Sequence, residues 1–248
     1  MKAIPMSTID TTSSRTLMNT ANNIHLTRLL QFTDSTCPIG AFTFSCGLES
    51  AVANGIVHNS DTLKEYVRAN AVQAAYCDAI AAIHAHRAAA EDNYGMILQA
   101  DKELLMVKMN DESRSMLRKM GRKFAELFNS ITPTPVSMQL IDSIRNNDTP
   151  GCYPTVQGVC FASIGINEHE LFISHQYGVI NMVLSAALRC VKVSHIDTQK
   201  ILFELMEEAT LLYDDVSSHR LDEMHCFCPE LDLMASIHEK GNLRMFMS

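Results

Sequence analysis

The apolar residues of this chain recur at the three- and four-residue spacing of amphipathic helices, and no long segment alternates like a half-buried strand. The clearest pattern covers about residues 112–129. Its apolar stripe consists of Leu117, Met120, Phe124, Leu127 and Phe128. Asn110 or Asp111 precedes the stripe, and either side chain can cap the first free N–H groups of a helix. The pattern therefore predicts a long amphipathic helix in the middle of the chain.

Similar patterns, bounded by Gly, Pro and capping residues, predict helices along most of the chain. Thr62 with Glu65 fits a capping box, and Asn167 and Asp197 fit N-caps. Residues 1–23 are polar and aperiodic. The remaining predicted helices cover about residues 24–36, 45–54, 62–90, 96–107, a short stretch ending near 145, 155–164, 167–190, 197–213 and 230–238.

These elements predict an all-α fold. We expect one helical-bundle-like domain of about eight to ten helices over residues 24–248. A flexible tail over residues 1–23 should precede it. Residues 214–229 are polar and contain two cysteines, so the pattern predicts a loop there.

Composition narrows the class of protein. The 248 residues carry a net charge of −8 and are 47% hydrophobic, which excludes a disordered polymer. The acidic balance also argues against binding nucleic acid through bulk positive charge. Only 19% of the residues are charged, below the roughly 25% of ordinary globular proteins. We therefore expect part of the surface to be covered by partners.

The same sequence predicts a cytoplasmic protein with reduced thiols. No secretory signal is visible, and no apolar run reaches the roughly 18 residues of a membrane span. The most apolar run, Val179 to Val191, contains Asn181 and Arg189. The eight cysteines then fit small buried side chains better than disulfides.

Motifs of common enzymes are absent from the sequence. It has no GxxxxGK[ST] phosphate loop, no GxSxG nucleophile elbow and no HExxH zinc motif. His84 and His86 are two apart and would point to different sides of a helix. We therefore expect no catalytic residues and no tightly bound cofactor.

One metal-like cluster lies near the carboxyl end. His225, Cys226 and Cys228 place a nitrogen and two sulfurs close together, with His219 nearby, and such ligands suit Ni²⁺, Zn²⁺ or Cu⁺. Two interpretations stay open, a transient metal contact and an ordinary polar loop. An alternative function, a thiol- or metal-dependent enzyme, would use this loop.

Four stretches together resemble the urease accessory protein UreF family. The run Leu29-Leu-Gln-Phe-Thr-Asp-Ser-Thr-Cys-Pro-Ile-Gly-Ala-Phe-Thr-Phe-Ser-Cys-Gly-Leu-Glu49 is similar to its LLQxxDSxxPIGx[FY]xxSxGLE signature. Arg114 followed by Gly121-Arg122 resembles its central helix. The other two matches are Gly158, Ala162, Gly165 and Ile166, and the ending His238-Glu239 with Leu243-Arg-Met-Phe-Met-Ser248.

This resemblance implies an all-α, dimeric, non-enzymatic protein that works in a complex. It implies partners UreD (called UreH in some organisms), the GTPase UreG and apo-urease, to which the assembly delivers Ni²⁺ with GTP hydrolysis by UreG. Any contact between nickel and this chain would be transient. The absence of a phosphate-loop motif agrees with this role, because the GTP would be bound by the partner UreG.

Candidate partner-binding residues follow from the residues and the resemblance. Arg114, Arg118 and Arg122 form a cationic row that could meet an acidic partner or remain a solvated face. Glu49 lies at a helix start, where the dipole favours a carboxylate, and could line a partner surface. The tail offers Leu243, Arg244, Met245, Phe246 and Met247 as anchors in a partner groove, or as packing on its own domain.

Overall fold

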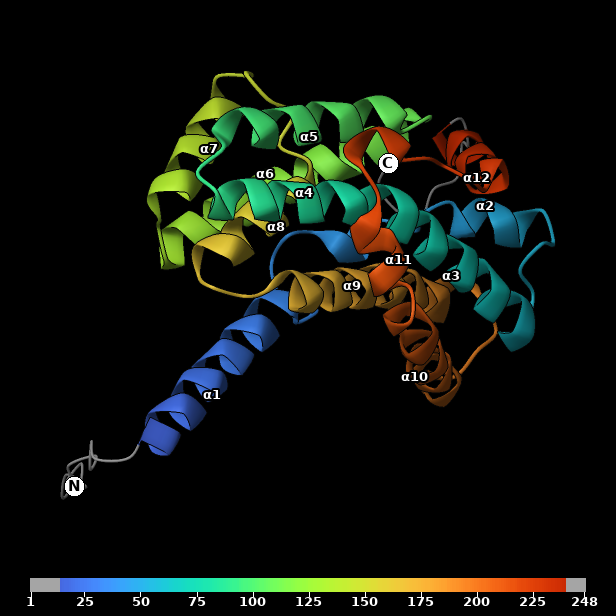
Figure 1. The fold of residues 1–248 in the computed structure, drawn as a ribbon. Coiled ribbons are helices and arrows are strands. Elements are labelled where there is room, and N and C mark those ends of the chain that lie inside the picture. Colours follow the sequence, from blue (N-terminus) through green and yellow to red (C-terminus); the bar gives the residue numbers. More distant parts are fainter. Residues whose placement is uncertain (1–13, 240–248) are drawn as a thin grey trace, which may run out of the picture.

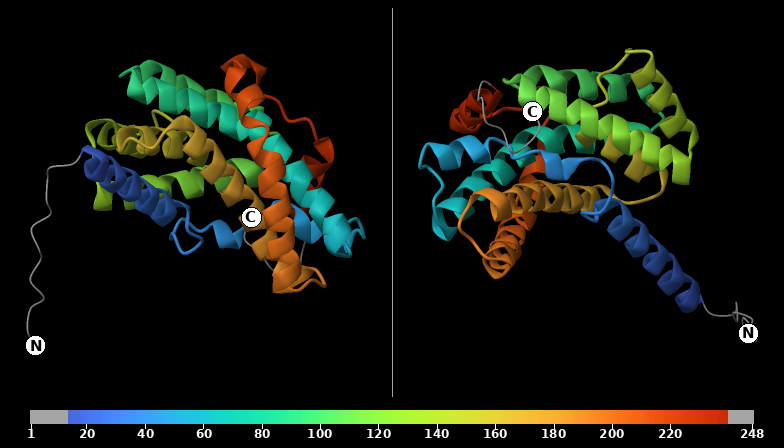
Figure 2. Two further views of the ribbon diagram at one scale, coloured as in Figure 1. Left: turned by 60° about the horizontal axis from the view of Figure 1, so that its bottom comes forward. Right: turned by 180° about the vertical axis from the view of Figure 1, so that it is seen from behind.

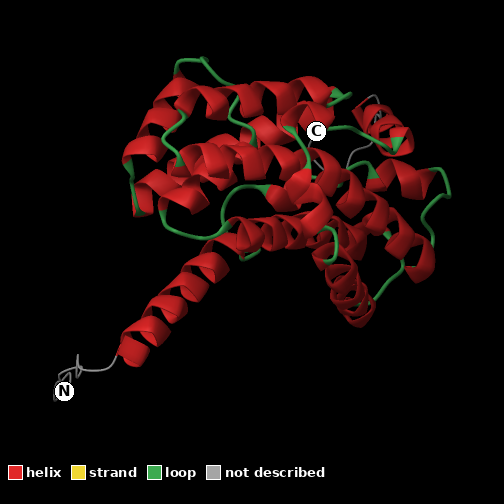
Figure 3. Ribbon diagram, in the orientation of Figure 1, coloured by secondary structure: helices red, strands yellow, loops and turns green. Residues whose placement is uncertain are grey.

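The computed structural model describes the backbone of residues 14–239 and the side chains of residues 23–237 (Figure 1). Over this range the regular elements are helices, labelled α1 to α12, with short 3-10 and π stretches between some of them. Figure 3 shows helices joined by loops, with no strand among the described residues. The prediction of an all-α fold is confirmed.

Two helices that are apolar around most of their circumference cross at the centre. They are α4 (Ile80–Ala90) and α8 (Tyr153–Ser163). A helix without a polar face is stable only when other helices surround it. Small residues let these two approach closely, because a Cβ built on Gly158 would lie 2.3 Å from the Ala82 carbonyl oxygen.

The helices α5 (Tyr94–Val107), α6 (Asp111–Ile131) and α7 (Pro135–Arg145) pack on this centre. The predicted stripe of α6 lies on its buried face: four of its five residues are buried, with Phe124 and Phe128 inaccessible to solvent, and only Leu127 is partly exposed. Phe124 packs edge-on against Phe32 at a centroid distance of 5.9 Å. Aromatic contacts of this kind add to the stabilisation from buried area.

A buried carboxylate fixes the loop between α7 and α8. Asp101 on α5 is 1% exposed. It accepts hydrogen bonds from Thr149 Oγ1 at 2.6 Å, Gly151 N at 2.6 Å and Cys152 N at 2.7 Å, and from the Thr155 hydroxyl. Several donors to one carboxylate offset the cost of burying its charge. Asp101 is therefore structural.

A second apolar cluster lies where α3 (Ser60–Ala74) and α9 (Glu168–Cys190) meet α10 (His195–Thr210). The short helix α2 (Leu48–Ala53) and the last helix α12 (Pro229–Glu239) close the same cluster. Arg68 on α3 pairs with Glu208 on α10 at 2.6 Å.

The α9 helix meets length and composition criteria for a membrane span. In this fold 61% of that window is buried among other helices. Buried core helices of water-soluble folds pass the same criteria, so α9 is explained by its packing.

The first helix differs from its prediction. α1 covers Ser14–Thr33, so it begins inside the segment 1–23 predicted as a tail. The polar residues before Ile24 carry no apolar stripe, and hydrophobic periodicity cannot detect such a helix. Figure 1 and the right-hand view of Figure 2 show the amino-terminal part of α1 extending away from the other helices. Residues 1–13 lie outside the described part.

Two helices are capped by a residue about one turn earlier than predicted. Asn59, not Thr62, caps α3, and Thr62 is the third residue of that capping box. Ser194, not Asp197, caps α10, and Asp197 reaches back to it in the same way. Asn110 and Asn167 cap α6 and α9 as predicted.

The long pattern over 62–90 is interrupted. A π-helical turn over Ala75–Ala79 joins α3 to α4. The segment 214–229, predicted as a loop, contains α11 (Tyr213–Ser218) and a 3-10 turn over Leu221–Glu223.

Candidate functional site

The segment from Asp34 to Gly47 forms a compact turn between α1 and α2, with a short 3-10 helix at Ala41–Thr43. Asp34 Oδ1 accepts from the Thr36 backbone N–H at 2.7 Å, which starts the turn. Gly40 has a φ of 85°, in the left-handed region that side-chain-bearing residues avoid. Ile39 is buried below the turn while Phe42 is 63% exposed. The segment is thus anchored from inside and presents an aromatic ring outside.

Glu49 lies in the first turn of α2, as predicted, and is partly exposed. The glycine two residues earlier positions this helix. A Cβ on Gly47 would lie 2.8 Å from the Ala235 backbone nitrogen and 3.0 Å from the Tyr66 hydroxyl oxygen. The helix that carries Glu49 is therefore packed against α12, the last described helix.

A partly open pocket lies beneath this turn, and we call it the chamber. It measures about 100 Å³. Its walls come from the turn, from α6 and from α9, with Asp78 of the π-helical turn and Tyr153 of α8. Thr33 at the end of α1 and the turn residues Cys37 and Ile39 line it, and methionines of α6 and α9 supply much of the apolar wall.

A buried ion pair stands at one side of the chamber. Lys108 Nζ lies 2.8 Å from Asp78 Oδ2, and the two residues are 6% and 9% exposed. Burial acts to lower the pKa of the Lys108 ammonium, but the Asp78 carboxylate and neighbouring thiols raise it above its usual range. Lys108 therefore remains a cation inside the fold.

His175 of α9 lines the chamber and is neutral. Burial lowers its pKa to about 4. Its Nδ1 lies 3.1 Å from Gln157 Oε1, an acceptor, so Nδ1 carries the proton and Nε2 keeps its lone pair. The sequence analysis missed Asp78, Lys108 and His175. The sequence offered one signal of such a site, because Asp78 is an ionisable residue inside an Ala-rich helical segment.

The three arginines of the predicted row differ in their environments. Arg114 is partly buried and its Nε donates to the Lys108 carbonyl at 2.9 Å, so it ties the start of α6 to the preceding turn. Arg122 is exposed and lies 3.1 Å from Glu126. Arg118 is exposed between them. The row is on one helix as predicted, but only Arg118 and Arg122 are well exposed.

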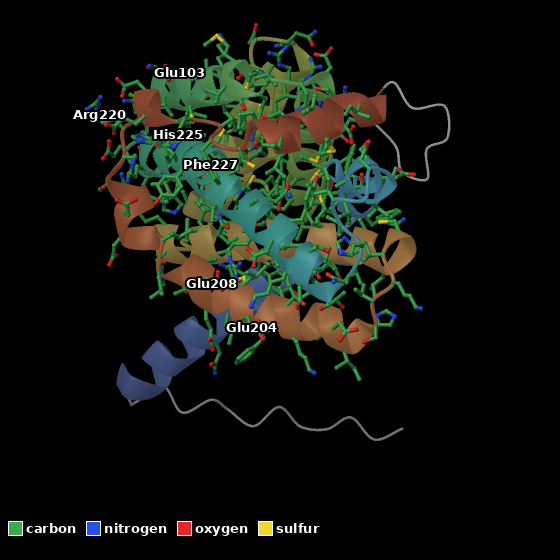
Figure 4. All side chains as sticks on the ribbon, turned by 90° about the vertical axis from the view of Figure 1, so that its right-hand side faces the viewer. Glu103, Glu204, Glu208, Arg220, His225 and Phe227 are labelled. Atoms are coloured by element: carbon green, nitrogen blue, oxygen red, sulfur yellow. The ribbon has the colours of Figure 1, made fainter. Side chains whose placement is uncertain are left out.

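The structure does not bring His225, Cys226 and Cys228 together as one ligand set. Within residues 23–237, no group of three or more His, Cys, Asp or Glu side chains is arranged to hold a metal ion. His225 Nδ1 contacts the Glu223 carbonyl at 2.8 Å, and Cys228 Sγ lies 3.5 Å from Glu230. Figure 4 shows His225 and Phe227 on the outer face of the segment before α12.

Cys226 faces inward, against Cys77. The Cys77 thiol donates to it and lowers the pKa of Cys226, and the Lys108 charge acts in the same direction. Tyr76 O accepts from the His225 backbone N–H at 3.2 Å, which holds this segment on the π-helical turn. The residues Leu243, Arg244, Met245, Phe246 and Met247 lie outside the described part of the chain.

Comparisons with known proteins identify relatives along most of the sequence. The UreF family model matches residues 57–206. The urease accessory protein UreF of Yersinia pseudotuberculosis serotype IB is 41% identical over 225 residues, which cover 91% of this chain and 99% of that protein. Urease accessory protein UreF 2 of Brucella canis is 41% identical over 223 residues, 90% of this chain and 92% of its own length.

Proposed function

This chain belongs to the UreF family of urease accessory proteins, and we propose that it is a non-enzymatic scaffold joining UreD (UreH) to the GTPase UreG. The observation that carries the proposal is the 41% identity to named urease accessory proteins over 91% of the chain. The assembly would insert Ni²⁺ into apo-urease in the cytoplasm, with GTP hydrolysed by UreG. Nickel is cargo in this scheme, and the chain itself has no phosphate-loop motif.

Exposed apolar side chains support a role in an assembly. Met106 and Met109, around the end of α5, are 70% and 67% exposed, and Phe203 on α10 is 69% exposed. Large apolar side chains on a surface favour association, because contact with a partner removes them from water. Partner proteins and a second copy of the chain would cover these faces.

The cationic row on α6 supports a contact with UreG. Arg118 and Arg122 are exposed on one helix of a protein whose net charge is −8. A local cationic surface on an acidic protein steers a partner with an acidic face. We propose that this row contacts UreG and that the tail residues Leu243, Arg244, Met245, Phe246 and Met247 contact UreD (UreH).

Pull-downs with each partner test the scaffold. The full chain should retain both UreD (UreH) and UreG, and a variant lacking residues 240–248 should lose UreD (UreH). The melting temperature of the truncated variant should match that of the full chain, which would show that the variant is folded and has lost only the contact. Failure of the folded full chain to retain either partner would reject the proposal.

A further inference from the structure

Two of the cysteines, Cys77 and Cys226, have their thiols in contact. They come from the π-helical turn over Ala75–Ala79 and from the segment before α12, which are far apart in the sequence. The Cys77 thiol donates a hydrogen bond to the Cys226 sulfur. Cys226 also packs against the apolar cluster that contains Cys77, and both thiols are free. The scaffold role uses neither thiol.

Backbone contacts hold the two cysteines beside each other. The His225 backbone N–H donates to the Tyr76 carbonyl oxygen at 3.2 Å. Those two residues directly precede the cysteines in the sequence. The Cys226 thiol in turn donates to the Val107 carbonyl oxygen at 3.7 Å. Because the sulfurs are already in contact, a disulfide between them requires rotation of the side chains rather than movement of the backbone.

The two thiols differ in their access to solvent and in their acidity. Cys77 is inaccessible to solvent, whereas Cys226 is partly exposed. The hydrogen bond from Cys77 lowers the pKa of Cys226 and the Lys108 ammonium acts in the same direction, although burial offsets part of this lowering. A thiol that is both accessible and more readily ionised is the better nucleophile for an oxidant. Cys226 is therefore the thiol that reacts first, and Cys77 is placed to react with its product.

We propose that Cys77 and Cys226 form a reversible disulfide when the chain meets a hydroperoxide. The Cys226 thiolate attacks a peroxide oxygen, so that an S–O bond forms, the O–O bond breaks, and the leaving oxygen takes the proton that the thiol gave up. The Cys77 thiol then attacks the sulfenic sulfur, so that the S–S bond forms, the S–O bond breaks, and water leaves with the Cys77 proton. With hydrogen peroxide, two thiols and one peroxide give one disulfide and two water molecules.

The disulfide would tie the segment before α12 covalently to the turn that joins α3 to α4. His225 and Phe227, on either side of Cys226, are exposed on the outer face of that segment (Figure 4), so oxidation would fix the surface that they form. Cytoplasmic thiol systems would reduce the bond again, which makes it transient. The pair lies within one chain and needs no partner protein, so this proposal and the scaffold role can fail separately.

Mass spectrometry of the full chain after treatment with hydrogen peroxide tests this proposal. The remaining thiols are alkylated, and the chain is digested with trypsin without a reductant. Peptide 69–87, which contains Cys77, should then be linked to peptide 221–240, which contains Cys226 and Cys228. Dithiothreitol should release the two peptides. If peptide 221–240 were recovered unlinked, or linked only to another cysteine, the proposal would be overturned.

Cys228→Ser is the matched control. Cys228 lies in the same tryptic peptide, but its sulfur lies 3.5 Å from Glu230. The linked peptides should form in Cys228→Ser as in the wild type, and should be lost completely in a folded Cys226→Ser variant. In Cys228→Ser only Cys226 remains in that peptide, so the link identifies its sulfur even where Cys226→Ser fails to fold. Loss of the link in Cys228→Ser, or its persistence in Cys226→Ser, would contradict the proposed pairing.

Discussion

Gly158 lies where α8 crosses α4, and a Cβ there would meet the Ala82 carbonyl oxygen at 2.3 Å. Backbone cannot move aside as a flexible side chain can. We therefore expect Gly158→Ala to lower the free energy of unfolding by about 3 kcal/mol, measured by denaturant titration.

Gly178 on α9 is the matched control for Gly158. No atom lies within 4 Å of a Cβ built there. Gly178→Ala should raise the free energy of unfolding by about 0.5–1 kcal/mol, because alanine loses less conformational entropy in a helix. Equal effects of the two substitutions would contradict the close crossing of α4 and α8.

The buried His175 should make stability depend on pH. Its pKa in the fold is about 4, below the roughly 6.5 of an unfolded chain. The unfolded state then binds the extra proton first as pH falls. The contribution of His175 to the free energy of unfolding is therefore fully present above about pH 6.5. It is lost as the pH falls to about 4, by roughly 3 kcal/mol in total.

Comparing His175→Gln with the wild type isolates this contribution. The difference in their unfolding free energies should change between pH 6.5 and pH 4, with the wild type losing more stability over that interval. Parallel pH profiles of the two proteins would show that His175 is not buried in its neutral form.

Single residues also show what the sequence could predict. The α6 stripe follows from spacing alone, because an amphipathic helix must bury its apolar face. The pairing of Asp78 with Lys108, and the place of His175 beside them, depend on how α3 to α9 pack. No local pattern encodes these contacts.

Apart from the start of α1, helix ends were predictable to within about one turn. In a capping box the first and fourth residues are both polar and bond reciprocally, so the sequence does not reveal which one begins the helix. This ambiguity displaced the predicted starts of α3 and α10. The early start of α1 had a different cause, since its first residues carry no apolar stripe.

The cap of α10 gives a test at this scale. Ser194 Oγ accepts from the Asp197 backbone N–H at 3.2 Å. Ser194→Ala should lower the free energy of unfolding by about 1 kcal/mol, measured by thermal and denaturant unfolding. Ser130→Ala, near the carboxyl end of α6, should change it by less than about 0.5 kcal/mol. A neutral Ser194→Ala would contradict the assigned start of α10.

For the whole molecule, the low charged fraction suggested a surface covered by partners, and the exposed side chains of α5 and α10 agree with that expectation. Sequence patterns predicted the fold class and the family. They could not place the chamber, because its walls come from segments far apart in the chain. Nor did they show that His225, Cys226 and Cys228 would form no metal-binding group among the described residues.

The cationic row gives a prediction about assembly. Arg118→Glu should weaken binding to UreG about tenfold at low salt, since reversing an exposed interface charge changes attraction to repulsion. Its melting temperature should stay close to that of the wild type. Arg145→Glu, an exposed arginine on α7 outside the row, is the control and should bind normally. Equal weakening by both variants would reject a specific contact through the row.

The scaffold role is tested most directly by measuring capture of UreG on immobilised UreD (UreH), with and without this chain. The account predicts that UreG is retained only when the chain is added, and in proportion to the amount of chain retained. Retention of UreG without the chain, or retention of the chain without UreG, would contradict it.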